Sequence, residues 1–310
     1  MKTSCCELLL TGCPRISEFE ELRSIYFPNS MFNCFLSCTA TMLNIVSIHA
    51  IRKTSSLPKT LKTLLLSLAV SDVGVGLVGQ PLYFSLLVMW LQQNNPGCNT
   101  YMLFNVIMGV FSLASHLGVV AVSVDRFLAV HLHLRYQELV THKRVVALVI
   151  SIWMMSAFRS LMILWTSDRI LNLVSVAVGV VGLCLTTLIY IRIYLVLRRH
   201  ENQIQVLQVQ QVAQTGEMAN FSSVIKSAVG VFYVYLVYLV CYLPFLISAA
   251  MFKIYGPSIA WKRYALFSFT LVFLNSSLNP VIYCWKMRHI RHAVMNILRN
   301  MLWHRNRASH

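Results

Sequence analysis

The stretch Ser123-Val124-Asp125-Arg126-Phe127-Leu128-Ala129-Val130 places an acid beside a base at the end of a long apolar run. The run reaches back to about Tyr101, which is long enough for a helix to cross the hydrocarbon layer of a membrane. Charged groups are costly inside hydrocarbon, so we expect this pair where membrane gives way to water. We predict a transmembrane helix over 101–130 and interpret Arg126 as the moving part of a switch.

The composition of the whole chain indicates an integral membrane protein. Hydrophobic residues make up 57% of the 310 residues, charged residues make up 12%, and the mean hydropathy is +0.65. An ordinary soluble domain carries about 25% charged residues. The sequence therefore excludes a soluble globular protein of the usual kind.

Seven apolar stretches are long enough to span a bilayer. They cover residues 31–51, 61–91, 101–130, 145–165, 170–197, 224–252 and 264–285. We predict an all-α fold, a bundle of seven transmembrane helices, with residues 29–286 as the membrane domain and residues 1–28 as a short tail before it.

Basic residues predict the orientation of the bundle. Lys and Arg gather after the first, third, fifth and seventh stretches, whereas the loop 92–97 carries no charge. Because cytoplasmic loops are enriched in Lys and Arg, the N-terminus is predicted outside the cell and the C-terminus in the cytoplasm. The net charge of +16 is then mostly a topology signal and an attraction to anionic membrane lipid, with nucleic acid a remote alternative.

Residues 287–310 are predicted to form an amphipathic helix on the membrane surface. Apolar residues recur there at helical spacing among Arg and His: Ile290, Val294, Ile297, Leu298 and Met301. This periodicity is typical of a helix with one apolar face. The alternative is a disordered basic tail.

Asp72 is the only acid deep within an apolar stretch, and an ionisable group there needs a partner or a purpose. Polar residues of other stretches that could meet it are Asn44, Ser115, Asn275, Ser276 and Asn279. Their oxygens suit a small hard cation such as Na⁺. A polar packing cluster without an ion is the alternative, and the spacing alone favours it.

Pro244 and Pro280 lie inside the sixth and seventh stretches. Each removes a helix hydrogen bond and predicts a kink. Kinked helices beside a buried acid indicate a protein with two conformational states, although each kink is also compatible with a purely structural role.

Together, the motifs resemble those of rhodopsin-like (class A) G-protein-coupled receptors. They are Asn44, Leu68-Ala69-Val70-Ser71-Asp72, Asp125-Arg126-Phe127, Trp153, Cys241-Tyr242-Leu243-Pro244 and Asn279-Pro280-Val281-Ile282-Tyr283. Leu134-Arg135-Tyr136 and Tyr190-Ile191-Arg192-Ile193 are similar to segments of adenosine receptors, the first also to melanocortin receptors. Like melanocortin receptors, the chain has Gly182 where most of the family has proline.

The resemblance implies a plasma-membrane receptor that senses an extracellular ligand and activates a heterotrimeric G protein, and that is not an enzyme. Arg126 would pair with Asp125 at rest, then meet Tyr190 and Tyr283 as the sixth helix opens. Leu134 would press into the G protein. The remaining residues of the implied switch are Tyr242, Pro244, Asn279 and Pro280.

The resemblance also implies an allosteric sodium site formed by Asp72, Ser115, Asn275 and Asn279, which reverses the preference for a packing cluster. Sodium there would favour the resting state. No other cofactor is expected.

Several positions depart from the family pattern. Tyr242 stands where a Trp is usual, and His116 and Tyr238 replace an apolar pair. Val224 replaces the acid that locks Arg126 in many relatives, so we hypothesise ligand-independent signalling.

The ligand is predicted to be small or lipid-like. Met108 stands where amine receptors carry an aspartate, and the residues that hold adenosine or basic peptides in relatives are also absent. The predicted pocket residues are Phe104, Met108, Met251, Phe252, Phe269 and Phe273. Helix packing or lipid contact explains these residues equally well.

Two alternatives stay open at the level of sequence. Cys98 lies near the position of the family's disulfide and is predicted either to pair with Cys13 or to stay free. From a different functional class, Asp72 and the kinked helices could serve an ion channel or transporter. That function predicts internal repeats or discontinuous helices, and the sequence contains no sign of either.

Overall fold

The computed structural model describes residues 14, 18–55, 57–94, 96–132, 135–165, 168–207, 215–256 and 258–308. Within these residues the regular secondary structure is entirely helical, and seven helices are long and apolar enough to cross a membrane. They correspond to the seven predicted stretches. The prediction of an all-α bundle of seven transmembrane helices is confirmed.

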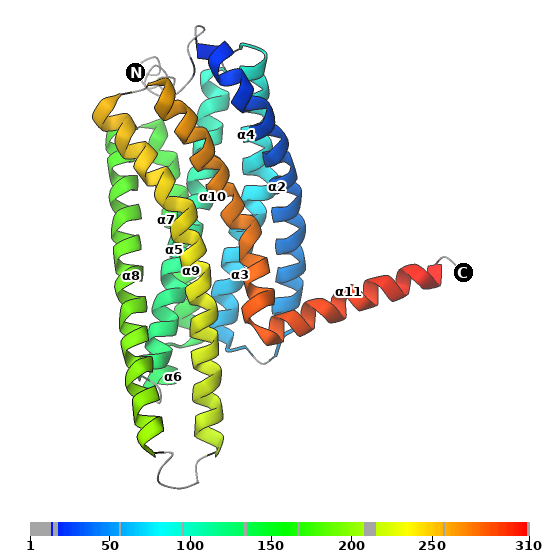
Figure 1. The fold of residues 1–310 in the computed structure, drawn as a ribbon, viewed down its shortest axis with the longest axis vertical. Coiled ribbons are helices and arrows are strands. Elements are labelled where there is room, and N and C mark those ends of the chain that lie inside the picture. The colour runs from blue at the N-terminus through cyan, green and yellow to red at the C-terminus, as the bar shows by residue number, and fades with distance from the viewer. Residues whose placement is uncertain are drawn as a thin grey trace.

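The helices run side by side along the long axis of the molecule, and the last helix leaves the bundle at one end (Figure 1). In chain order they are α2 (Phe19–Lys53), α3 (Lys59–Gly74), η2 (Val75–Gly79), α4 (Gln80–Leu91), α5 (Cys98–Leu132), α6 (Tyr136–Leu139), α7 (His142–Leu161), η4 (Met162–Leu164), α8 (Asp168–Leu207), α9 (Thr215–Tyr255), α10 (Ile259–Lys286) and α11 (Arg288–Ala308). We call the end of the bundle at α11 the basic end, and the opposite end, where α2 and α10 begin, the far end.

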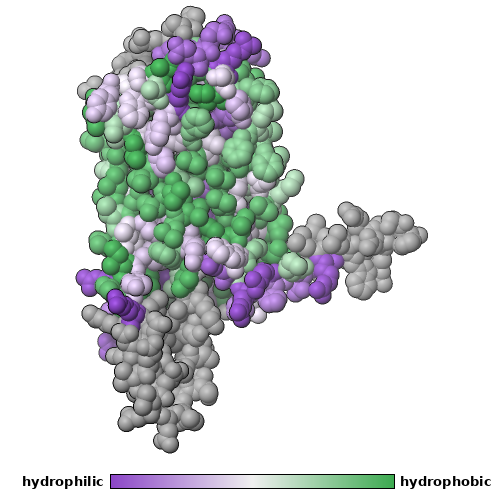
Figure 2. Space-filling model, in the orientation of Figure 1, coloured by the Kyte–Doolittle hydropathy of each residue, from purple (hydrophilic) through white to green (hydrophobic). Residues whose placement is uncertain are grey.

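The surface of the bundle suits a lipid environment. Figure 2 shows hydrophobic residues over the middle of the visible face and hydrophilic residues towards both ends. Large apolar side chains such as Phe35, Met154 and Phe158 are more than 60% exposed. Soluble monomers rarely expose apolar surface on this scale, because contact with water is unfavourable.

The second span is an irregular helix. It passes from α3 through the π turn η2 into α4. Pro81 lacks an N–H and its ring clashes with a carbonyl one turn earlier, so the backbone widens directly before it. Gly76 lies in this turn, and a Cβ there would lie 2.7 Å from Oγ1 of Thr41 on α2. The glycine therefore permits the close approach of α2.

The first span begins earlier than the sequence predicted. Helix α2 starts at Phe19, so it includes residues that were predicted as part of the tail, and the start of the membrane domain at residue 29 stays a prediction. Pro28 lies inside the helix, although it removes a hydrogen bond. Phe19, Leu22 and Tyr26 are all at most 2% exposed. Burial of these large apolar groups stabilises the additional turns.

The hydrophobic core consists of two clusters. The first lies towards the basic end and includes Leu68, Val122 and Tyr283, whereas the second lies towards the far end and includes Val75 and Phe273. Along the second span, Asp72 falls between Leu68 and Val75. On this span the buried Asp72 therefore lies between the two apolar clusters.

Helix α11 packs one face against the bundle. Ile290 is fully buried, and Ala293, Val294 and Ile297 contact the first cluster. The predicted helix after the seventh span is confirmed, and a disordered tail is wrong for residues 288–308. Its contact with a membrane surface stays a prediction, and the side chains of Leu298 and Met301 lie outside the described part of the chain.

Candidate functional site

The Asp125–Arg126 pair lies near the basic end of α5. Arg126 is 1% exposed and Asp125 is 4% exposed. Nε of Arg126 donates to Oδ2 of Asp125 at 2.9 Å, and Nη2 of Arg126 also donates to this oxygen. The structure therefore holds Arg126 against the partner expected at rest. Its motion in a switch stays a prediction.

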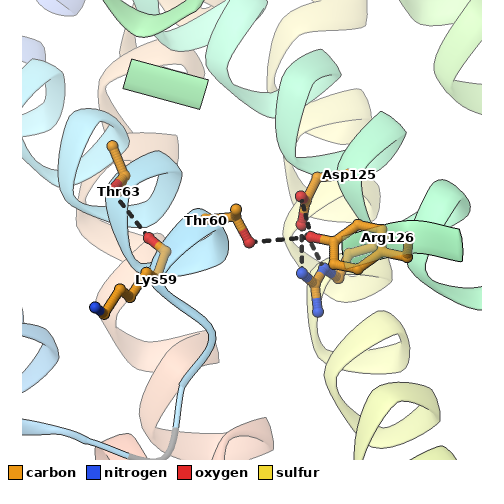
Figure 3. A network of polar contacts seen from close by, with 6 residues as sticks. Lys59, Thr60, Thr63, Asp125 and Arg126 are labelled. Carbon is orange, nitrogen blue, oxygen red and sulfur yellow. Dashed lines mark hydrogen bonds and ion pairs between the residues drawn. The ribbon is translucent and has the colours of Figure 1, made fainter. Parts of the chain in front are cut away.

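The second carboxylate oxygen of Asp125 is also occupied. The hydroxyl of Tyr136, on α6, donates to Oδ1 of Asp125 at 2.6 Å. Because the only phenol proton is used in this bond, the Thr60 hydroxyl donates to the phenol oxygen, 3.0 Å away (Figure 3). This network links α3, α6 and α5. Sequence reasoning missed the role of Tyr136, although it singled out the segment that contains it.

Tyr136 is protonated under physiological conditions. Burial, followed by the negative charge of Asp125, raises the pKa of Tyr136 to about 12. Both effects disfavour the phenolate. The Tyr136 hydroxyl therefore keeps the proton that it donates to the Asp125 carboxylate at neutral pH.

The other residues of the predicted switch differ in how close they lie to Arg126. The hydroxyl of Tyr190 lies 3.2 Å from Oγ of Ser123, which precedes Arg126 by three residues on α5. Tyr283 is fully buried in the first cluster, with a hydroxyl that has no hydrogen-bond partner among the described residues. Leu134 and the side chain of Val224 lie outside the described part of the chain.

Asp72 lies at the centre of a buried polar layer. Nδ2 of Asn279 donates to Oδ2 of Asp72 at 2.8 Å. Nδ2 of Asn44 donates to the carbonyl oxygen of Ser276 at 2.8 Å. These bonds join α2, α3 and α10 through groups that are all less than 5% exposed.

Several polar atoms of this layer have no hydrogen-bond partner within the described ranges. They are Oδ1 of Asp72, Oγ of Ser115, both amide atoms of Asn275 and Oδ1 of Asn279. Such buried groups need a partner. Carboxylate, amide and hydroxyl oxygens are ligands for hard cations, so the predicted residues fit Na⁺. The described residues contain no group of three His, Cys, Asp or Glu side chains that could hold a metal.

Tyr242 extends the polar layer towards α8. Its hydroxyl lies beside Ser112 and Ser115, and its ring stacks on Tyr238 with 4.1 Å between centroids. The Tyr238 hydroxyl is 2.5 Å from Nδ1 of His116. The unusual residues at these three positions therefore form one connected group.

Gly182 provides the space for the His116 ring. A Cβ at Gly182 on α8 would collide with Nε2 of His116 on α5. The same nitrogen lies 3.3 Å from the carbonyl oxygen of Val178, one turn before Gly182 on α8. The departures from the family pattern thus compensate one another. Pro244 and Pro280 lie inside α9 and α10, as predicted.

Comparisons with known proteins agree with this architecture. The family model "7 transmembrane receptor (rhodopsin family)" matches residues 43–169. The chain is 24% identical over 274 residues to melanocortin receptor 5 of Homo sapiens, which covers 85% of this chain and 82% of that receptor. The chain belongs to the rhodopsin family of seven-transmembrane receptors. It is thus a class A G-protein-coupled receptor and a multi-pass membrane protein, and the prediction that it is not an enzyme is confirmed.

Two further relatives and one solved structure are similar to the receptor. The receptor is 33% identical over 113 residues to adenosine receptor A2b of Gallus gallus, a match that covers 36% of this chain and 32% of that receptor. It is 26% identical over 323 residues to olfactory receptor OR51C1 of Homo sapiens, with 94% of this chain and 95% of the relative covered. The crystal structure of squid rhodopsin matches the fold with a TM-score of 0.76 at 17% identity, covering 90% of this chain and 87% of that chain.

Most of the predicted pocket residues of the receptor gather in the second core cluster. Phe104, Met108, Phe269 and Phe273 belong to it or pack against it. The ring of Tyr83, which sequence reasoning missed, lies 5.8 Å from Phe104, 5.7 Å from Phe269 and 5.1 Å from Phe273 between centroids.

The remaining two predicted pocket residues lie elsewhere. Met251 and Phe252 are half-buried on α9 and belong to neither core cluster. The six residues therefore do not form one cluster. Tyr83 connects the aromatic group to α4, and Phe245 of α9 packs on Phe269 with 5.2 Å between ring centroids. Ligand contact by any of them stays a prediction.

Cys98 of the receptor forms a disulfide. The alternative that it stays free is therefore wrong. Cys13, its predicted partner, lies outside the described residues, so that pairing stays a prediction. Cysteines of the spans such as Cys38 and Cys241 are free.

Proposed function

We propose that this receptor senses an extracellular ligand at the plasma membrane and activates heterotrimeric G proteins from its basic end. The observation that carries the proposal is the buried Asp125–Arg126 pair at that end, held by Tyr136. The Lys and Arg residues around it support a cytoplasmic location for this end. The N-terminus then lies outside the cell and the C-terminus inside.

Activation requires a change in the partners of Arg126. In the resting state the guanidinium contacts the Asp125 carboxylate, which also accepts the Tyr136 hydrogen bond. Tyr190 already lies within electrostatic range of Arg126. A ligand that binds more tightly to a state with Arg126 released shifts the equilibrium by its difference in affinity. The released side chain then meets Tyr190 and Tyr283, and the cleft opened by α9 receives the G protein, including contact with Leu134.

Sodium stabilises the resting state in this proposal. Asp72, Ser115, Asn275 and Asn279 supply oxygen atoms in the layer between the two core clusters. Tyr242 and Asn279 border this layer, and Pro244 and Pro280 lie on the two helices that carry them. An ion held there opposes the rearrangement of α9 and α10 because it joins groups from several helices.

The receptor also signals without a ligand in this proposal. Val224 offers no carboxylate to Arg126 from α9, so one common restraint on opening is missing. The Tyr136 hydrogen bond provides a different restraint on the resting pair. Basal activity is therefore expected to exceed that of a receptor-free membrane.

Nucleotide exchange on G proteins tests the proposal. Membranes with the receptor are expected to accelerate GTPγS binding by at least one class of heterotrimeric G protein, and Arg126→Ala is expected to abolish the effect. Arg23→Ala is the matched control, because Arg23 is exposed on α2 near the far end. Equal exchange by wild type and Arg126→Ala, at equal surface expression, would refute the proposal. The channel or transporter alternative has no support from the family match, which is to receptors.

A further inference from the structure

Three buried polar side chains in the second cluster region have unsatisfied atoms. Gln80 is fully buried, and neither of its amide atoms has a partner among the described residues. The same holds for the hydroxyl of Tyr83, 2% exposed, and for Oδ1 of the fully buried Asn33. Native proteins leave few buried polar atoms unpaired. Each of these atoms therefore calls for a partner.

The three side chains lie at adjacent levels of the bundle. Oγ of Ser37 on α2 donates to the carbonyl oxygen of Gly76 at 2.7 Å, which fixes the register between the first and second spans. The two spans run in opposite directions, so we infer that Asn33, one turn before Ser37, lies near the level of Gln80, which follows Gly76 across the π turn η2. Tyr83 follows Gln80 by three residues and shares its helix face.

The surroundings of this polar group are apolar or aromatic. Met108 packs against Gly79, the residue before Gln80, because a Cβ at Gly79 would lie 2.5 Å from its sulfur atom. Phe104 and Phe273 contact the Tyr83 ring. Each of these side chains is at most 6% exposed, and none carries a charge. An ionised ligand group would therefore receive no counter-charge from these side chains, which is unfavourable.

We propose that Asn33, Gln80 and Tyr83 bind the polar head of a neutral ligand that both donates and accepts hydrogen bonds, a carboxamide. The amide of Gln80 offers a donor and an acceptor, so it forms two parallel bonds with another amide. The Tyr83 hydroxyl and Oδ1 of Asn33 form the remaining hydrogen bonds of the ligand's amide group. The apolar body of the ligand lies against Phe104, Met108 and Phe273.

This assignment rests on the proposed receptor function and defines the ligand class more closely. The sequence suggested only a small or lipid-like ligand. It placed no polar recognition group in the pocket, because a single Gln in an apolar run gives no indication of which residues surround it.

Binding of three matched compounds to the purified receptor in lipid nanodiscs tests the proposal. The probes are 4-phenylbutanamide, its methyl ester analogue methyl 4-phenylbutanoate, and the 4-phenylbutanoate anion, measured by saturation-transfer NMR with empty nanodiscs subtracted. The ester lacks the donor and the anion carries a charge. We expect the amide to bind about tenfold or more tightly than either analogue, since each unpaired buried group costs about that factor.

Variants locate the binding site. Gln80→Leu is expected to weaken amide binding about tenfold, and Tyr83→Phe severalfold, since it removes one hydroxyl without changing the ring. Gln92→Leu is the matched control, because Gln92 is exposed near the end of the same span. If Gln80→Leu does not fold, the test of the binding site rests on Tyr83→Phe. Equal binding of the three probes, binding of none, or no loss in Tyr83→Phe would overturn the proposal and indicate water as the partner.

A separate readout distinguishes this inference from the proposed function. Basal GTPγS exchange of Tyr83→Phe and wild type is compared with that of Arg126→Ala. Selective amide binding without any exchange that depends on Arg126 would refute the G-protein function and leave the binding site intact. Exchange that depends on Arg126 together with unselective probe binding would refute only the carboxamide site.

Discussion

The hydroxyl of Tyr136 donates a 2.6 Å hydrogen bond to the Asp125 oxygen that Arg126 leaves free. The short helix α6 is thereby tied to the end of α5 at a carboxylate that is 4% exposed. Asp125 is held from two sides, by a cation and by a neutral donor. Release of Arg126 therefore disturbs the connection to α6 as well.

Replacement of Tyr136 by Phe is expected to raise basal G-protein activation. The variant removes a hydrogen bond to a charged group, which is worth about 1.5–3 kcal/mol in the state that contains it. If only the resting state contains it, the ratio of active to resting receptor rises about 10- to 150-fold. GTPγS exchange measures the change, with Tyr194→Phe as the control because Tyr194 is 61% exposed on α8. Unchanged basal exchange in Tyr136→Phe would show that this bond persists in the active state.

The effect of Tyr136 on basal G-protein activation is expected to be independent of pH in the physiological range. The pKa of Tyr136 in the folded receptor is about 12, above the value of about 10 for an unperturbed tyrosine. The folded state thus binds the proton more tightly, and the resulting stability is complete below about pH 10 and declines as the pH rises towards 12. The difference in basal exchange between wild type and Tyr136→Phe should be constant from pH 6 to 9.

Sodium is expected to stabilise the receptor through Asp72. At a concentration ten times its Kd, a single bound ion adds about 1.4 kcal/mol. Thermal unfolding in NaCl should therefore occur at a higher temperature than in choline chloride at equal ionic strength. Asp72→Asn should remove this difference, whereas Glu138→Gln, at an exposed position on α6, should keep it. A sodium effect of full size in Asp72→Asn would exclude this site.

Gly182→Ala is expected to destabilise the receptor because the added Cβ collides with the His116 ring. Overpacking of this kind costs about 1–3 kcal/mol. Gly118→Ala is the matched control, since its Cβ would meet only Leu68 at an ordinary 3.5 Å. The double variant Gly182→Ala with His116→Ala should recover part of the loss in melting temperature. If the losses in melting temperature of the two single variants simply add in the double variant, the proposed fit between Gly182 and His116 is wrong.

The buried ion pair at the far end should contribute more to stability than the exposed pair beside it. Nζ of Lys262 lies 2.6 Å from Oε2 of Glu18, with the two side chains 6% and 16% exposed. Loss of the Glu18 carboxylate removes this compensation from the buried Lys262 charge, which costs up to about 3 kcal/mol. Glu18→Gln should therefore lower the melting temperature clearly.

Glu21→Gln is the control for this comparison. Glu21 lies 3.5 Å from Arg263, and their side chains are 61% and 44% exposed. Exposed pairs contribute about 0–1 kcal/mol because water screens them. Equal losses in melting temperature for Glu18→Gln and Glu21→Gln would show that the burial of the Glu18–Lys262 pair does not increase its contribution to stability.

The seven spans and their order could be predicted from the sequence because hydrocarbon imposes a simple condition. Each crossing needs about 20 mostly apolar residues, which is a local property of the chain. The pairing of Asp125 with Arg126 could be anticipated for a similar reason, since adjacent opposite charges at a helix end are visible in the sequence. The start of α2 could not, because Phe19 and Leu22 are helical through packing against residues distant in sequence.

The partners of the polar side chains were decided by the tertiary structure alone. Tyr136 reaches Asp125, Gly182 admits His116, and Lys262 meets Glu18 across 244 positions of the chain. A π turn and a hydrogen bond set the register of the first two spans, from which we infer that Asn33 lies near the level of Gln80, with Tyr83 one turn further along. Apolar periodicity is summed over many residues and survives any single substitution. A hydrogen bond depends on the position of two atoms within a few tenths of an ångström, and only the packed bundle determines that position.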